Sequence, residues 1–269
     1  MAIYLYCLTE PGRAPPEDLR GVARAKVRVV DVAGRLAAWV SDLPEELGAA
    51  TTEQVQLHDH VVRAALAKET PLPARFGQSF AGDSALRRAL EARVDLLVRS
   101  LERVRGGVEM TVRILLPKSK DLVAAGGVPE APPDAPDGGF VGARGEADRA
   151  ERASVPPGVG AAGSGTPSGA GRAYLARLRE RQRASAELQR QAEFLQARVA
   201  RAVDGIVREE VCSPVMLGSH SFAVSHLLAR EAVGEYRLAV DSLINADPAL
   251  RLLVSGPWAP YSFARLAND

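Results

Sequence analysis

The stretch RAYLARLRERQRASAELQRQAEFLQARVARAVDGIVREE, residues 172–210, carries the strongest helical signal in the chain. Its apolar residues recur every three or four positions, which places them along one face of a helix. Polar residues interrupt this seam at Arg181 and Ser185. The spacing predicts one long helix whose seam packs like a coiled coil, within the chain or against a partner. The predicted seam residues are Tyr174, Leu178, Leu188, Ala192, Leu195, Val199, Ala202 and Ile206.

The residues just before this helix have a different composition. Residues 121–170 hold 11 of the 24 glycines and 7 of the 18 prolines, and large aliphatic side chains nearly vanish there. Such a stretch buries too little apolar surface to offset the entropy of ordering it. We therefore expect three parts. These are an N-terminal α+β domain at 1–120, a flexible linker or long variable loop at 121–170, and a C-terminal α+β domain at 171–269 with the long helix and an aromatic tail.

Short strands and helices alternate on both sides of the linker. Apolar patterning predicts strands at 2–8, 26–32, 35–41, 108–116, 211–217, 221–228 and 250–255. Helices are expected at 51–68, 84–105 and 232–245. Ala33 and Gly34 stand between two strand-like runs and indicate a hairpin. The fold class is therefore α+β, in two lobes of similar type, and the strand pairing cannot be read from the pattern.

Two of the predicted helices have specific end signals. Thr51 and Gln54 stand three apart and form a capping box at the start of 51–68. Asp83 can cap the start of the helix at 84–105, which we expect to be continuous. The side chains expected to be buried in the first of these helices are Val55, Val61, Val62, Ala65 and Leu66.

Composition and charge exclude several broad classes. The chain has 269 residues, with 34 Lys and Arg against 33 Asp and Glu, a net charge of +1. This balance argues against a generally basic nucleic-acid binder. No apolar run reaches about 18 residues, the minimum for a transmembrane helix. The N-terminal residues lack a basic region and a cleavage site, so we expect no signal peptide.

Motifs for catalysis, cofactors and metals are absent or out of context. The one GxGxxG, at Gly158, Gly160 and Gly163, lies inside the Gly/Pro-rich stretch rather than between a strand and a helix. His58 and His60 stand two apart, so on a helix they point to different faces and are expected on a polar surface. We therefore predict no enzyme activity, no cofactor, no metal site and no small-molecule substrate.

The cysteines and the arginine-rich helix also have ordinary interpretations. Cys7 and Cys212 are far apart in the chain and are expected to be two buried, reduced thiols. The long helix carries nine arginines interleaved with six acidic residues between Arg172 and Glu210. Interleaved charges are typical of a solvated helix face, so we predict no nucleic-acid binding.

Two aromatic motifs are less easily explained as ordinary structure. The first, Leu72 to Phe80, reads LPARFGQSF and places Arg75, Phe76, Gly77 and Phe80 in a short connection between helices. It is either a packed loop or a binding turn. The second, Ser255 to Phe263, reads SGPWAPYSF. It is either a tail clamped onto the core or an aromatic recognition surface. The tail's candidate residues are Gly256, Pro257, Trp258, Pro260, Tyr261 and Phe263.

With two further segments, these motifs resemble the gas vesicle protein family GvpF/GvpL, and the resemblance favours the F branch. The further segments are the strand Tyr4-Leu5-Tyr6 and the Gly-x-x-Tyr-Leu start of the long helix, Gly171 to Leu175, which adds Tyr174 to the candidates. The most specific segment is the ending, Gly256 to Phe263. Ala259 stands where the family usually has proline, and Gln78 where threonine is common.

The resemblance implies a non-enzymatic accessory or minor structural protein of the gas vesicle, located in the cytoplasm and associated with the vesicle. It implies two α+β domains, of which the C-terminal one resembles a modified ferredoxin-like fold. The implied partners are the small, hydrophobic shell protein GvpA and other accessory Gvp proteins, with no nucleic acid or lipid membrane. The expected role is to bind GvpA and prevent its aggregation during nucleation. The alternative is a coiled-coil oligomerisation module that self-associates through Leu188–Ile206.

Overall fold

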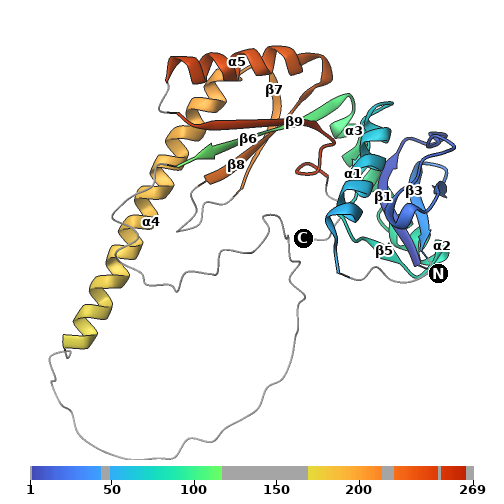
Figure 1. Ribbon diagram of the computed structural model, residues 1–269, viewed down its shortest axis with the longest axis horizontal. Helices are drawn as coiled ribbons and strands as arrows, with labels where there is room; N and C mark the ends of the chain where they lie inside the picture. Colours follow the sequence, from blue (N-terminus) through green and yellow to red (C-terminus); the bar gives the residue numbers. More distant parts are fainter. Residues whose placement is uncertain (1, 44–48, 117–168, 214–220, 248–249, 265–269) are drawn as a thin grey trace, which may run out of the picture. The chain divides into compact units, whose positions relative to one another are not determined.

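The computed structural model describes residues 2–43, 49–116, 169–213, 221–247 and 250–264 (Figure 1). The chain is α+β and divides into two units. One comprises Met1–Pro117 with Leu188–Asp269, and the other is Lys118–Glu187. The predicted linker at 121–170, with its GxGxxG, lies outside the described residues except for the last two. Among the described helices, none is long and apolar enough to cross a lipid bilayer.

The first sheet contains the N-terminal strands. Its order is β2 (Val27–Val32), β3 (Leu36–Leu43), β1 (Ala2–Thr9) and β4 (Leu72–Pro73), and β5 (Ser79–Phe80) also pairs with β1. All of these pairs are antiparallel. The predicted hairpin is confirmed, with Val32 paired to Leu36 across a three-residue turn, and Ala33 (54°) and Gly34 (65°) have the positive φ angles that this turn requires.

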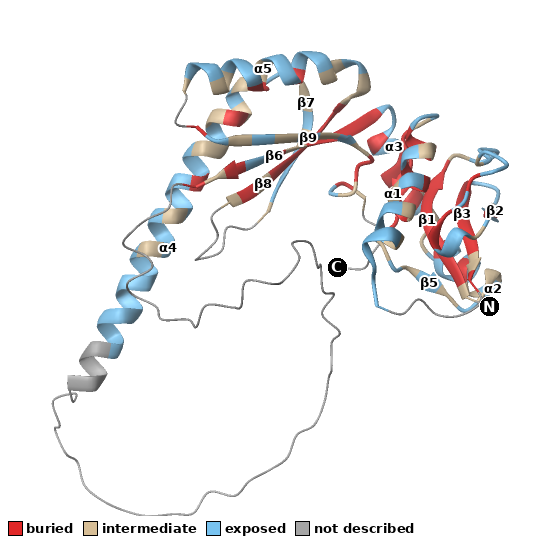
Figure 2. Cartoon of the chain, in the orientation of Figure 1, coloured by how far each residue is buried: buried red, intermediate tan, exposed pale blue. Residues whose placement is uncertain are grey.

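Helices cover both faces of this sheet. Strand β1 shows the alternation directly, since Tyr4 and Tyr6 belong to one core cluster and Ile3 and Leu5 to the other. The first cluster includes α1 (Thr52–Leu66), and the second includes α2 (Asp83–Glu91) and α3 (Val94–Val104). Because both faces are covered, β1 is buried along almost its whole length (Figure 2).

Two predictions for these helices need correction. The capping box of Thr51 and Gln54 is confirmed, but Val55 is 45% exposed because it lies on the outer side of α1. The continuous helix predicted over 84–105 is wrong. The backbone leaves helical geometry at Arg93 (φ −130°, ψ 14°), which separates α2 from α3. The break lets each short helix turn its own apolar stripe onto the sheet.

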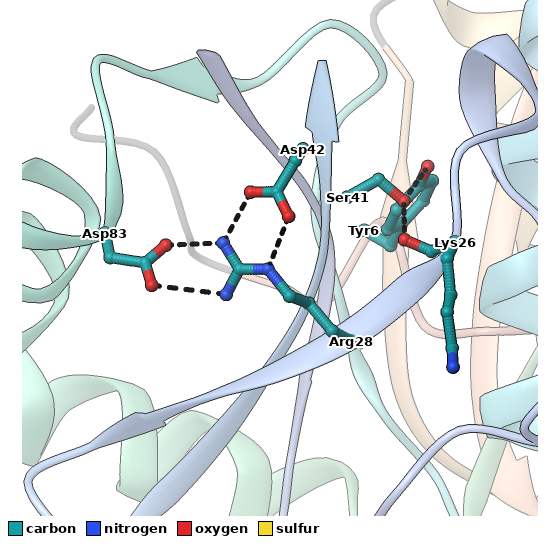
Figure 3. A network of polar contacts seen from close by, with 6 residues as sticks. All are labelled: Tyr6, Lys26, Arg28, Ser41, Asp42 and Asp83. Carbon is teal, nitrogen blue, oxygen red and sulfur yellow. Dashed lines mark hydrogen bonds and ion pairs between the residues drawn. The ribbon is translucent and has the colours of Figure 1, made fainter. Parts of the chain in front are cut away.

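Asp83 does not cap α2, because its carboxylate holds an arginine instead. Arg28 donates to Asp42 from Nε (2.8 Å) and Nη2 (2.6 Å), and to Asp83 from Nη1 (3.2 Å) and Nη2 (2.7 Å) (Figure 3). The hydrogen bonds to Asp42 and then Asp83 raise the pKa of the guanidinium. This clamp ties β2 and β3 to the start of α2. Beside it, Tyr6 donates to Ser41, which donates to the carbonyl of Lys26.

The second sheet joins residues from both sides of the Gly/Pro-rich stretch. Its order is β7 (Val207–Cys212), β8 (Ser221–Ala229), β6 (Gly107–Leu115) and β9 (Leu252–Trp258), with antiparallel pairs throughout. Strand β6 precedes that stretch in the chain, yet its two neighbours follow it. With α4 (Gly169–Ala202) and α5 (Val233–Ala246), the element order is β-α-β-β-α-β, the order found in ferredoxin-like folds.

The long helix is shorter than predicted. It ends at Ala202 instead of Glu210, and Gly205 (φ 76°) opens the turn into β7. Within the first unit its seam is buried in the chain's own core, where Ala192 is 2% and Val199 0% exposed. Short 3₁₀ turns lie at Val22–Arg24 and Arg230–Ala232.

The cysteines are only partly as predicted. Both are free thiols, Cys7 is buried and Cys212 is exposed. The burial expected for Cys212 is wrong because it lies at the end of β7, whose last residues face solvent. Burial raises the pKa of the Cys7 thiol, which keeps it protonated.

Candidate protein-binding site

The turn at Leu72–Phe80 is fixed to the first sheet at both ends. Strand β4 pairs Pro73 with Cys7, and β5 pairs Phe80 with Ile3, so both strands flank the same partner, β1. Between them, the N–H of Gly77 donates to the Tyr4 hydroxyl at 3.0 Å. The residues between these anchors are therefore held in place by β1.

The C-terminal segment is anchored just as firmly. After β9, the chain turns back and inserts Phe263 (1% exposed) into the core cluster that contains Leu5 and Leu72. Glu109 of β6, 5% exposed, accepts from the N–H of Ser262 at 2.8 Å and from its hydroxyl at 2.7 Å. These contacts fix the path of the tail past Tyr261.

The two anchored segments meet at a hollow of about 270 Å³. Its walls are mostly apolar, and it opens beside the exposed side chain of Arg75. Among the described residues, no hydrogen bond or ion pair reaches the guanidinium of Arg75. The lining residues are Pro73, Arg75, Phe76, Gly77, Gln78, Tyr261 and Ala264. We call this site the motif hollow.

An aromatic cluster stands behind Phe76. Its ring packs against those of Tyr4 and His58, at centroid distances of 6.1 and 5.8 Å. The Tyr4 hydroxyl hydrogen-bonds Nδ1 of His58 at 2.9 Å. Desolvation by burial raises the pKa of Tyr4 and of Tyr261, so both phenols stay neutral. The cluster gives the turn a rigid apolar support.

The prediction that His58 lies on a polar surface is wrong, because the residue is buried and only 3% exposed. It lies on the face of α1 that packs against β1, next to Tyr4 and Tyr6. Burial lowers its pKa to about 4, which the backbone of Ala74 offsets only in part. Its Nε2 is buried and has no hydrogen-bond partner among the described residues.

Trp258 lies outside the motif hollow. Its half-buried ring is covered by the guanidinium of Arg63, 4.5 Å from the ring centroid, and its Nε1 donates to Ser255 at 3.4 Å. Arg63 is held in turn by Asp59, one helical turn earlier, at 2.5 Å. Trp258 therefore connects the end of β9 to α1 through a cation–π contact.

The remaining candidate residues are dispersed. Phe80 packs partly buried against the cluster of Leu5, and Pro260 is buried. Gly256 adopts φ +114° with Glu109 and Met110 beside it, and Pro257 is exposed. Tyr174 belongs to the other unit, where it is 67% exposed. The structure thus brings Arg75, Phe76, Gly77 and Tyr261 together.

Three residues that hold the two motifs in place were not predicted from the sequence to do so. They are His58, Arg63 and Glu109. Glu109 has a signal in the sequence, because it is an acidic residue between the apolar residues Val108 and Met110 of a predicted strand. Arg63 carries no such signal, because one arginine among many on a helix surface looks like any other.

A second hollow of about 270 Å³ differs in chemistry. Its lining includes Glu10, Glu69 and Arg105, and these charges already have partners within the chain. Arg105 pairs with Glu10 and Arg13 with Glu69, each at 2.9 Å. Across the described parts of the chain, no three His, Cys, Asp or Glu side chains gather as metal ligands. The motif hollow is therefore the stronger candidate for binding another protein.

Comparisons with solved structures show that the fold is shared with gas vesicle proteins. The chain resembles the crystal structure of GvpF from Anabaena sp. PCC7120 with a TM-score of 0.68 and 18% identity, over 99% of this chain and 97% of that one. It resembles GvpF from Microcystis aeruginosa with a TM-score of 0.67, also at 18% identity, over 98% and 99% of the two chains.

Sequence relatives point the same way. Gas vesicle protein F of Streptomyces sp. (strain CB03234) is 29% identical, over 98% of this chain and 99% of its own. Gas vesicle protein L of the same strain is 27% identical, over 99% and 94%. The family described as gas vesicle synthesis protein GvpL/GvpF matches residues 2–265. The chain therefore belongs to the GvpL/GvpF family of gas vesicle synthesis proteins.

Proposed function

We propose that this protein assists gas vesicle assembly by binding the hydrophobic shell protein GvpA at the motif hollow. The observation that carries the proposal is the meeting of the two aromatic motifs around one mostly apolar cavity. Both segments are held from behind by buried contacts, through Tyr4 on one side and Glu109 on the other. Binding there would cost little ordering entropy, because the walls are already in place.

The chemistry of the hollow fits an apolar side chain with a carboxylate next to it. Phe76 and Tyr261 supply apolar surface, and the exposed guanidinium of Arg75, which no other described residue pairs with, supplies a cation at the rim. A shell subunit exposes apolar surface before it assembles, and such surface favours aggregation. Covering part of it until the subunit joins the growing shell would keep it available for assembly. The protein would act in the cytoplasm and on the vesicle, with GvpA and other accessory Gvp proteins as partners.

The test is co-expression of the full chain with GvpA from the same gene cluster, followed by affinity capture at low and high salt. Capture that survives high salt supports an apolar contact, because surface charge pairs weaken as salt screens them. Arg75→Glu should reduce capture and Arg75→Lys should keep most of it. Arg87→Glu, an exposed arginine of α2, controls for the change in net charge. If Arg87→Glu reduced capture as much as Arg75→Glu, the effect would come from net charge, which would contradict a specific site at the motif hollow.

The structure speaks against the self-associating alternative at Leu188–Ile206. That seam is covered within the chain, where Ala192 and Val199 are each at most 2% exposed and Leu195 packs partly buried against the same core cluster. A second copy would have to displace the chain's own core to reach it. We therefore do not propose that segment as an oligomerisation site.

A further inference from the structure

The outer part of α4 carries apolar side chains that no described residue covers. Tyr174, Leu175 and Leu178 are 67%, 45% and 41% exposed, and Figure 2 shows this stretch of α4 as exposed. Tyr174 and Leu178 stand four apart, and Leu175 and Leu178 three apart, so the three form one continuous patch. The patch lies on the second unit, which ends at Glu187, and shares no residue with the motif hollow.

Three exposed arginines border this patch, and a fourth, Arg183, lies on the opposite face of α4. With 3.6 residues per turn, Arg177 lies on one side of it and Arg179 on the other, and Arg181 lies in line with Tyr174 and Leu178 at the patch's C-terminal end. Among the described residues, no ion pair reaches any of the four. Glu180 is the only acidic residue between Tyr174 and Arg183. The patch is therefore a stripe of exposed apolar side chains with positively charged arginines beside it.

This arrangement disfavours the isolated helix. Arg177 with Arg181, and Arg179 with Arg183, are like charges four residues apart, a spacing that destabilises a helix. Carboxylates from another molecule would relieve that repulsion while apolar side chains covered Leu178. Charged residues that flank an apolar seam select the charge of the helix that pairs with it.

We propose that Tyr174–Arg183 of α4 binds an acidic amphipathic helix of a partner protein. The partner's apolar stripe covers Tyr174 and Leu178, and its Glu or Asp side chains meet the bordering arginines. Charge excludes a second copy of this chain as the fitting partner, because either orientation would place arginine against arginine. Nucleic acid would use the arginines but leave the leucines without an apolar partner. The proposal does not depend on GvpA binding.

The test uses the full chain and two synthetic helical peptides with fluorescent labels. Both have leucine at the two seam positions of each heptad. One has glutamate and the other lysine at the flanking positions. Fluorescence anisotropy should show the glutamate peptide binding about 10-fold or more tightly than the lysine peptide, with affinity falling as salt rises. Leu178→Ala should weaken binding of the glutamate peptide.

Charge reversal gives the decisive comparison. The double variant Arg177→Glu/Arg181→Glu should lose the glutamate peptide and gain the lysine peptide, while Arg177→Lys/Arg181→Lys keeps the original preference. Circular dichroism checks that each variant folds. Equal binding of both peptides, or a preference that charge reversal leaves unchanged in a folded variant, overturns the proposal. It is also overturned by duplex RNA or DNA binding that Leu178→Ala leaves intact, or by dimerisation that Leu178→Ala abolishes.

Discussion

Glu109 and Ser262, 153 positions apart, are joined by two hydrogen bonds in which one buried carboxylate accepts from both the backbone and the hydroxyl of the serine. Glu109→Ala should lower the free energy of unfolding by about 2–3 kcal/mol, because hydrogen bonds to a charged acceptor are strong and their loss leaves the N–H of Ser262 without its partner. Urea denaturation measures this. Ser262→Ala keeps the backbone bond and should cost about half as much. Equal stability of Glu109→Ala and the parent would contradict the anchoring role.

His58 should make the protein less stable as the pH falls from 6.5 toward 4. Its folded pKa is about 4 against an ordinary 6.5, so in this window the unfolded chain binds the proton and the folded chain does not. Above pH 6.5 the histidine is neutral in both states and does not reduce the free energy of unfolding. Below pH 6.5 the free energy of unfolding falls progressively, by up to about 3 kcal/mol. Unfolding free energies measured from pH 7 to 4 give the slope.

The matched control is His60, which is exposed on the same helix. His58→Gln should flatten the slope and His60→Gln should leave it unchanged. His226 also has a pKa lowered by burial and contributes to the slope in all three proteins. Only the difference between the variants therefore reports on His58. An identical slope in His58→Gln and the parent would show that His58 is not the group responsible.

Arg63 and Trp258 should be coupled in stability. Each single alanine variant removes the cation–π contact, and the double variant should lose less than the sum of the two. The expected coupling energy is about 0.5–1 kcal/mol, since the pair is partly exposed. A double-mutant cycle by urea unfolding measures it. We expect Trp258→Ala to remain folded, and an unfolded variant would show that Trp258 is a core residue.

Gly256 should not tolerate a side chain. At φ +114°, a Cβ would lie 2.7 Å from the carbonyl oxygen of Glu109, so Gly256→Ala adds both backbone strain and a steric clash. We expect a loss of about 3 kcal/mol. Gly12 also has a positive φ, with open space around it, and Gly12→Ala should cost about 1 kcal/mol. Comparable costs at the two positions would contradict the close packing of β9 against β6.

Local sequence signals predicted most of the elements because they depend on neighbouring residues. The capping box at Thr51, the hairpin turn at Gly34 and the strand of Tyr4 all lie where the pattern placed them. The errors come from long-range packing. Nothing near Arg93 breaks a helix, and only the fit of α2 and α3 to the sheet explains the interruption there.

The candidate site was predictable in its parts and not in its arrangement. The motifs around Phe76 and Tyr261 stand out in sequence, but their meeting depends on contacts between distant parts of the chain. The turn is held by β1 and the tail by Glu109, and no local pattern indicates either contact. The same limit applies to His58. Its burial depends on which side of α1 faces Tyr4.

The most direct test of the central proposal is the affinity of the purified full chain for GvpA, compared among hollow variants that remain folded. Arg75→Glu changes the rim, and Gln78→Trp fills the cavity with a bulky side chain. Each should weaken binding about 10-fold or more, while Arg75→Lys and Arg87→Glu stay within about 3-fold of the parent. Unchanged affinity of both Arg75→Glu and Gln78→Trp would contradict GvpA binding at the motif hollow.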